Sequence, residues 1–153
     1  MSKIFRQKGF TLPEVLLSAV IIMVAVLALV GLFPTALQNV RYGGHMSQAS
    51  SLAQEMIEMI RTQPFSNVSS YNYPDTSVPP PGGLPGPVLA HLTQWRNDIA
   101  PANPAGVLPQ GRGSISVTAV AGLPDLFQVT VTVSWQERGN QTVTLVTYVA
   151  RYG

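Results

Sequence analysis

One acidic residue, Glu14, lies at the start of a long apolar stretch and calls for a chemical explanation. From Val15 to Phe33 the chain carries no charged side chain, and this run is long enough to cross the hydrocarbon core of a membrane as a helix. A charge within such a helix costs about 2.5–3.5 kcal/mol by insertion measurements. Glu14 therefore requires a partner, and a nearby cation would serve.

Cleavage of the chain after Gly9 would supply that cation. Glu14 would then lie in the first helical turn, where the helix dipole favours a negative group by about 0.3–1 kcal/mol. Pro13 is compatible with this turn, because the first N–H groups of a helix have no intrahelical acceptor. The new amine would be that of Phe10. Since one helical turn separates it from Glu14, the ion pair could instead form between neighbouring chains on parallel helices.

The order Lys8-Gly9-Phe10-Thr11-Leu12-x-Glu14 before a long apolar run resembles the class III signal of type IV pilins and of type II secretion pseudopilins. The resemblance implies that a prepilin peptidase cleaves after Gly9 and methylates the amine of Phe10. It also implies that Glu14 neutralises the N-terminus of an adjacent subunit during assembly. The implied partners are other pilin or pseudopilin subunits, the peptidase, an inner-membrane assembly platform and membrane lipid.

Two simpler interpretations of this segment remain open. A secretory signal peptide has an apolar core of roughly 7–15 residues and an A-x-A cleavage site, whereas this run is longer and no A-x-A precedes Arg41. A plain signal anchor would keep the N-terminus cytoplasmic, because Lys3, Arg6 and Lys8 obey the positive-inside rule, and would export the rest. It leaves Glu14 unexplained.

Composition argues against several other classes of function. Three of the nine basic residues lie in residues 1–9, so the remainder is nearly neutral and no nucleic-acid partner is predicted. The absence of cysteine excludes disulfides and thiol chemistry. His45 and His91 lack metal-ligand spacing to an acidic residue, and no catalytic motif is present. We therefore expect no enzyme, no cofactor and no metal site.

The apolar segment is expected to continue into a long spine helix. We expect a leader at 1–9, a transmembrane and assembly helix at 10–33, and an amphipathic continuation at 34–63, with weak points at Pro34 and Gly43-Gly44. The continuation carries apolar residues at helical spacing, which are Ala49, Leu52, Ala53, Met56, Ile57 and Ile60. Gln48, Ser51, Glu55 and Glu58 take the opposite side.

The region 64–113 is rich in proline and glycine. Residues 66–90 are expected to form an extended connecting loop, with a Pro-rich recognition ligand as the alternative. A short amphipathic helix is expected at 89–99 between Pro87 and Pro101, with Trp95 in the core. A turn at Leu108-Pro109-Gln110-Gly111 follows.

Residues 114–153 show the period-two alternation of β-strands. The alternation covers 115–119, 127–135 and 142–149, and turn residues at 122–125 and 137–140 separate these runs. An antiparallel meander is the simplest pairing, and the spine helix can cover its apolar face. The predicted fold is α+β, with a long N-terminal spine helix packed on a small antiparallel sheet of about three strands, which is the pilin architecture.

The Trp-bearing helix, the Leu-Pro-x-Gly turn and the strands that follow are similar to the PilV-like minor pilins. The expected function is thus a minor pilin-like subunit of a type IV pilus, first in the inner membrane and then in a fibre. A minor pseudopilin of type II secretion or DNA uptake, located in a periplasmic pseudopilus, is the alternative within this class. A membrane-anchored binding domain that never polymerises is the alternative from another class.

Overall fold

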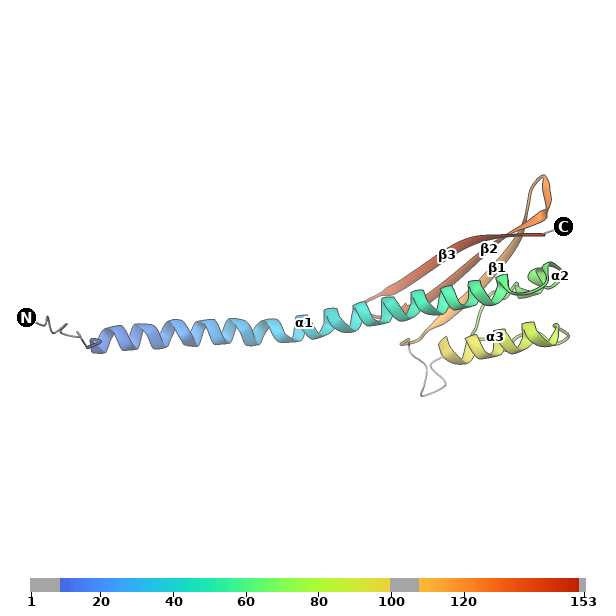
Figure 1. Ribbon diagram of the computed structural model, residues 1–153. Coiled ribbons are helices and arrows are strands. Elements are labelled where there is room, and N and C mark those ends of the chain that lie inside the picture. Colours follow the sequence, from blue (N-terminus) through green and yellow to red (C-terminus); the bar gives the residue numbers. More distant parts are fainter. Residues whose placement is uncertain (1–8, 100–107, 152–153) are drawn as a thin grey trace, which may run out of the picture. The chain divides into compact units, whose positions relative to one another are not determined.

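The computed structural model describes residues 9–99 and 108–151 of the chain and has an α+β fold (Figure 1). The chain divides into two units, Met1–Arg41 and Tyr42–Gly153. Most of the expected leader, together with Pro101, lies outside the described residues.

Helix α1 runs from Leu12 to Arg61. It continues through Pro34 and through Gly43-Gly44, where the sequence predicted weak points. A proline within a helix removes one backbone N–H, and the helix continues on both sides of Pro34. The helix is unbroken at both positions, so the long spine helix expected from the sequence is confirmed.

The part of α1 in the second unit is amphipathic, as its spacing predicted. Ala49, Ala53, Met56, Ile57 and Ile60 are buried, whereas Gln48, Ser51, Glu55 and Glu58 are exposed. The helix ends before Pro64, because the residue preceding a proline is biased out of the helical region.

The segment after α1 differs from the extended loop expected at 66–90. Its first part forms a short helix, α2 (Phe65–Val68), followed by a 3-10 turn, η1 (Ser69–Tyr71). Val68 and Tyr71 are fully buried there. These turns are too short to show a helical period in the sequence, and burial of their apolar side chains decides the conformation.

Helix α3 runs from Gly86 to Ile99 and so begins earlier than the predicted 89–99. Pro87 occupies its first turn, where a missing N–H has no cost. Trp95 is buried, as expected, and its indole N–H donates a hydrogen bond to the Leu52 carbonyl at 3.0 Å. This bond joins α3 to α1 within the head.

Three strands form one antiparallel sheet in the order β1-β2-β3, which confirms the predicted meander. The strands are β1 (Arg112–Val120), β2 (Leu123–Gln136) and β3 (Asn140–Ala150). The expected turn at 122–125 is shorter than predicted, since β2 already begins at Leu123. Gly122, with φ of 79°, takes most of the reversal, a conformation that glycine adopts without strain.

The inner face of the sheet supplies much of the core of the head. Ile115 of β1 and Val129, Val131, Val133 and Trp135 of β2 are buried together with the apolar side of α1. The predicted turn at Leu108-Pro109-Gln110-Gly111 is present, with the Gly111 N–H donating to the Leu108 carbonyl at 3.1 Å. The α+β arrangement expected from the sequence is therefore confirmed.

Candidate functional site: the N-terminal processing and assembly segment

Gly9, Phe10 and Thr11 precede the first residue of α1 and have no regular secondary structure. Gly9 is exposed, and 81% of the Phe10 surface is accessible. A Cβ added at Gly9 would meet nothing within 4 Å. Within the described chain, the Gly9–Phe10 peptide bond is thus open to an approaching enzyme.

Glu14 lies in the first turn of α1, as the sequence predicted. Its Oε2 atom accepts a long hydrogen bond from the Thr11 N–H, at 3.5 Å. The Thr11 carbonyl in turn accepts from the N–H groups of Glu14 and Val15, at 3.0 and 3.1 Å. This is one half of a capping box, in which a side chain at the third helical position bonds back to the cap residue.

The capping bond brings no opposite charge to Glu14. The Thr11 N–H is a neutral donor, and the described residues place no cation within ion-pair distance of the Glu14 carboxylate. From the described part of the chain, the partial positive charge at the helix N-terminus acts on it. Within residues 9–99 and 108–151, the requirement for a cationic partner argued from the sequence is therefore not met.

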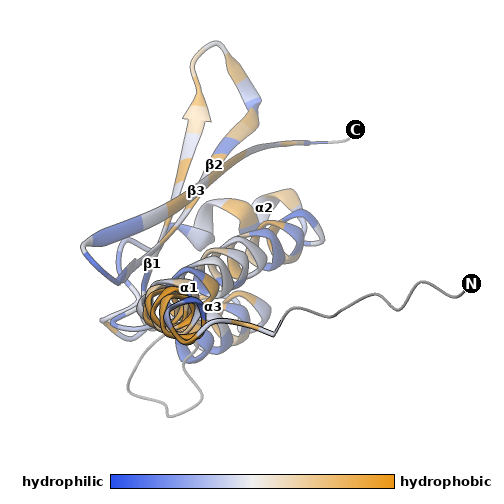
Figure 2. Ribbon diagram, turned by 90° about the vertical axis from the view of Figure 1, so that its left-hand side faces the viewer, coloured by the Kyte–Doolittle hydropathy of each residue, from blue (hydrophilic) through white to orange (hydrophobic). Residues whose placement is uncertain are grey.

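The apolar part of α1 presents its large side chains in every direction. Between Leu12 and Phe33 these side chains are 51% to 75% exposed, and every described residue up to Arg41 is exposed. Figure 2 shows this part of the helix as hydrophobic all round. A helix that is apolar on all sides is stable in lipid or among other apolar helices. By length and composition it can cross a membrane.

The N-terminal segment also matches a known family model. Residues 4–30 match the prokaryotic N-terminal methylation motif. The chain carries this motif. The motif is consistent with type IV pilins and pseudopilins, the proteins that the residues around Gly9 resemble. Those proteins are structural subunits that a prepilin peptidase processes. With the apolar helix, the motif indicates membrane anchoring. No curated protein and no solved structure gives a significant match to the chain.

The head offers little catalytic chemistry among its described residues. No group of three side chains that could hold a metal ion occurs there. His45 and His91 each have a separate partner: His45 Nδ1 lies 2.8 Å from Glu137 Oε2, and His91 Nδ1 lies 2.6 Å from the Tyr71 hydroxyl. Burial raises the pKa of Tyr71 to about 12, so this phenol is neutral at physiological pH.

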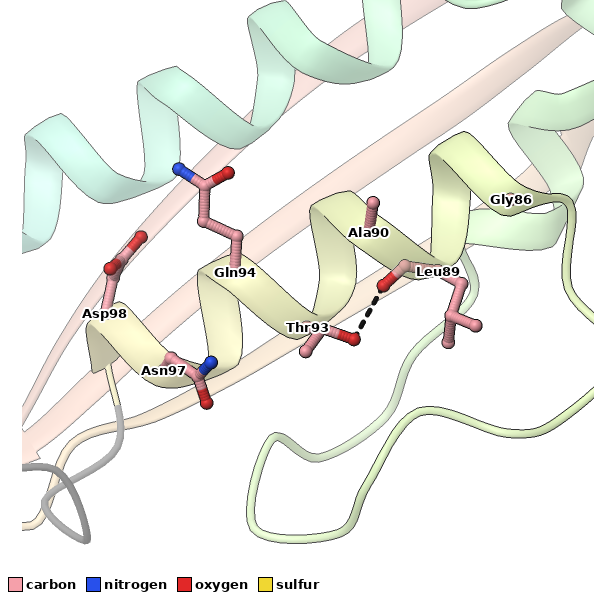
Figure 3. A pocket seen from close by; sticks show the side chains of 7 residues that line it. All are labelled: Gly86, Leu89, Ala90, Thr93, Gln94, Asn97 and Asp98. Carbon is pink, nitrogen blue, oxygen red and sulfur yellow. Dashed lines mark hydrogen bonds between the residues drawn. The ribbon is translucent and has the colours of Figure 1, made fainter.

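A shallow depression lies along the exposed side of α3 (Figure 3). It is lined by Gly86, Leu89, Ala90, Thr93, Gln94, Asn97 and Asp98, with a volume of about 530 Å³. The Thr93 hydroxyl donates to the carbonyl of Leu89 at 2.7 Å, an ordinary bond within a helix. These lining side chains include no base beside a nucleophile, so the depression does not suggest a reaction.

The contacts between His45 and Glu137 and between Tyr42 and Gln141 had no signal in the sequence. The Tyr42 hydroxyl donates to the Gln141 side chain at 3.0 Å. Both contacts join the start of the head's helical segment to the β2–β3 hairpin. Their partners lie far apart in the chain, so only the fold brings them together.

Proposed function

We propose that the protein is a minor pilin-like subunit of a type IV pilus, processed by a prepilin peptidase and assembled from the inner membrane through α1. The observation that carries the proposal is the methylation motif at residues 4–30, joined to a helix whose apolar surface is exposed on every side. The minor role rests on the similarity of the Trp95 helix and the Leu108-Pro109 turn to the PilV-like group.

In this proposal, cleavage occurs after Gly9 and the new amine of Phe10 is methylated. The N-terminus begins in the cytoplasm and the head is exported, with α1 crossing the inner membrane between them. The subunit then leaves lipid as its apolar helix packs against those of its neighbours. Such a bundle replaces contacts with lipid by contacts between helices. Neighbouring helices can take only those axial positions at which the buried charge of Glu14 is neutralised.

Glu14 selects the alignment in this scheme. Moved into an apolar bundle without a partner, its carboxylate would oppose assembly, because an uncompensated buried charge is strongly unfavourable. The methylated amine of Phe10 in a neighbouring subunit would supply the compensating cation. The pairing requires a defined axial stagger between helices, so Glu14 contributes to the register as well as to stability.

The mass of the mature N-terminal peptide tests the proposal. In cells that contain a prepilin peptidase, we expect a chain that begins at Phe10 and carries one additional methyl group. Replacing Gly9 by isoleucine should block cleavage and preserve residues 1–9, and a Cβ at this position meets no described atom within 4 Å. Retention of residues 1–9 in the protein of natural sequence, in cells that contain the peptidase, would overturn the proposal.

A pseudopilin of type II secretion or DNA uptake would need the same N-terminal residues for processing and assembly. Deletion of the gene separates the two machines. Loss of surface fibres with normal export of secreted enzymes supports the pilus subunit. Loss of secreted enzymes or of DNA uptake, with fibres intact, supports the pseudopilin.

A further inference from the structure

The outer face of the sheet, the side turned away from the buried core of the head, is lined mainly by hydroxyl groups. Side chains of a strand alternate between two faces, so the even-numbered residues share this one. The pairing register aligns them in rows across the strands, such as Ser114, Thr132 and Thr144. None of them is buried. The outer face consists of Arg112, Ser114, Ser116 and Thr118 of β1; Gln128, Thr130, Thr132 and Ser134 of β2; and Thr142, Thr144, Val146 and Tyr148 of β3.

The Ser and Thr hydroxyls of the outer face make few bonds within the head. The Thr132 and Thr144 hydroxyls lie 3.3 Å apart, and the Ser134 hydroxyl donates to the Arg112 carbonyl at 3.4 Å. Both contacts are long for hydroxyl groups, whose hydrogen bonds usually measure about 2.7–2.8 Å. Between described residues, no other hydrogen bond involves a Ser or Thr hydroxyl of this face. Most of its donors and acceptors thus remain available to water or to a ligand.

A polar pocket lies at one end of the outer face. Its volume is about 250 Å³, and it is lined by Gln110, Arg112, Ser134, Trp135, Gln136 and Asn140. Arg112 and Ser134 belong to the outer face as well, so the pocket and the face are continuous. Most ligand pockets are lined predominantly by apolar and aromatic side chains. A lining of amide, hydroxyl and guanidinium groups therefore fits a hydrophilic ligand.

The single cation of the outer face, Arg112, has an acidic neighbour. Its Nη1 atom lies 3.7 Å from Asp75 Oδ2. Hydrogen bonds from Ser77, first that of its backbone N–H, lower the pKa of Asp75, so this carboxylate is ionised at neutral pH. Asp75 belongs to the segment that covers the β1 edge, where Tyr73 and Ile115 exchange backbone hydrogen bonds of 2.9 and 2.7 Å. The site is therefore close to neutral and favours an uncharged ligand.

This composition distinguishes between classes of ligand. Nucleic acids and anionic lipids are bound by clusters of Lys and Arg, which the outer face lacks. Protein interfaces are enriched in aromatic residues, Met and Arg and depleted in Ser, whereas Ser and Thr fill the middle of this face. Hydroxyl and amide groups both donate and accept hydrogen bonds. The hydroxyl groups of a saccharide do the same, so they complement this surface.

An aromatic residue lies at the other end of the outer face. Tyr148 is 56% exposed and pairs with Gln128 of β2. Gln128 and Ser134 lie about 20 Å apart along the strand, with the hydroxyl rows between them. An aromatic ring can pack against the apolar C–H face of a sugar ring while its hydroxyl stays in water. A chain of several sugar residues can therefore contact the pocket, the hydroxyl rows and Tyr148.

We propose that the outer face of the sheet, together with the pocket at its Arg112 end, binds a neutral oligosaccharide or polysaccharide. The pocket holds one end of the ligand and Tyr148 packs on a sugar ring farther along. The opposite face of the sheet packs on α1 within the head, so assembly through α1 does not require the outer face. This activity is additional to the proposed role as a pilus subunit, and it does not depend on processing or assembly.

A glycan array probed with the full chain tests the proposal. The chain would be kept in a polyoxyethylene detergent, because sugar-headed detergents could occupy the face. The array would carry neutral and acidic glycans, and calorimetry would measure the affinity for the strongest neutral one. We expect neutral glycans of several residues to bind. Their affinity should change little between about 0.1 M and about 1 M salt, because the recognition involves no ion pair that salt could screen.

Removal of two hydroxyls locates the ligand. Thr132→Val combined with Ser134→Ala keeps the shape of β2 and should weaken binding by about tenfold, the effect expected from the loss of two hydrogen bonds. Thr93→Val combined with Ser51→Ala is the matched control, since both residues are exposed on helices away from the sheet. It should bind like the natural chain. Near-ultraviolet circular dichroism would verify that both variants are folded.

The length of the glycan tests the path along the strands. Tyr148→Ala should weaken the binding of hexasaccharides and leave that of disaccharides unchanged, whereas Tyr148→Phe retains the ring and should bind both normally. Equal losses for both lengths would contradict the path. The proposal is overturned if no glycan on the array binds, if only acidic glycans bind and about 1 M salt abolishes their binding, or if the Thr132→Val, Ser134→Ala variant binds as tightly as the natural chain.

Discussion

At the scale of single residues, Glu14 suits one environment, the N-terminus of a helix, and is unfavourable in another, a fully apolar surrounding. In the isolated chain its carboxylate caps the start of α1 through the Thr11 N–H, a contact of 3.5 Å that satisfies an orphan donor. The bond carries no compensating charge. Glu14 is therefore compatible with a membrane surface or a helix N-terminus, and it becomes unfavourable wherever the helix is fully surrounded by apolar groups.

Replacing Glu14 by alanine should leave membrane insertion intact and reduce incorporation into filaments by roughly tenfold or more. The amine of Phe10 would then be buried without a counter-ion, at a cost comparable to that of other buried charges in apolar surroundings. Filament fractions compared with total membrane fractions by immunoblot measure this. Glu55→Ala, on the exposed side of α1, is the matched control. Equal incorporation of both variants would exclude an assembly role for Glu14.

Tyr71 makes the stability of the head sensitive to alkali. Its pKa is raised from 10.0 to about 12 by burial, so the folded state favours the neutral phenol more strongly than the unfolded state does. Its stabilising contribution is complete below pH 10 and is lost as the pH rises from 10 to 12. Two pKa units correspond to about 3 kcal/mol.

Chemical denaturation of the protein at several pH values measures this effect. Tyr71→Phe should weaken the loss of stability between pH 10 and 12, although it also removes the hydrogen bond to His91 at every pH. Tyr148→Phe, at an exposed position, should leave the profile unchanged. A steep alkaline loss that persists fully in Tyr71→Phe would assign the effect to other groups.

At the scale of elements, the packing of α3 on β1 depends on the absence of one side chain. A Cβ added at Gly113 would lie 2.5 Å from the Trp95 ring and 2.8 Å from Ile99 Cδ1. The ring is held by its hydrogen bond to Leu52, so it cannot move away without losing that bond. The glycine at the start of β1 is thus required by close approach to α3.

Gly113→Ala should therefore destabilise the head by about 1–3 kcal/mol, the usual cost of overpacking a core. Gly44→Ala should have the opposite sign and stabilise by up to about 1 kcal/mol, since it lies within α1 with open space around it. Thermal unfolding followed by tryptophan fluorescence distinguishes the two variants. Equal stability of Gly113→Ala and the natural protein would contradict the close packing.

At the scale of the whole molecule, the two units have different requirements. Every buried residue that the structure describes lies in the second unit, between Ala49 and Thr147. Every described residue of the first unit is exposed and most are apolar. The second unit can bury its apolar side chains within itself, whereas the first needs lipid or other helices.

A fragment that begins at Tyr42 should therefore fold and remain in aqueous solution without detergent, whereas the full chain should require detergent or lipid. The near-ultraviolet circular dichroism of Trp95 and Trp135 checks the fold of the fragment, and sedimentation checks its solubility. A fragment that loses the tryptophan signal would show that residues before Tyr42 contribute to the core.

The sequence alone determined those features whose causes are local. The order of residues from Gly9 to Glu14 and the uncharged run behind it predict a processing segment without any tertiary contact, and residues 4–30 match the N-terminal methylation motif. The strands follow from alternation, because side chains of a β-strand alternate between two faces. The buried positions of α1 follow from the helical period for the same kind of reason.

Only the tertiary structure decided the features that depend on residues far apart in the chain. The turns of α2 and η1 form because the fold buries Val68 and Tyr71, and the pairing of His45 with Glu137 needs the β2–β3 hairpin to reach α1. Which sheet edge is covered was equally undetermined, since a strand's own pattern does not reveal its neighbours. These features depend on packing between residues that are distant in the chain. No local sequence pattern relates such residues, so the sequence alone did not predict the contacts.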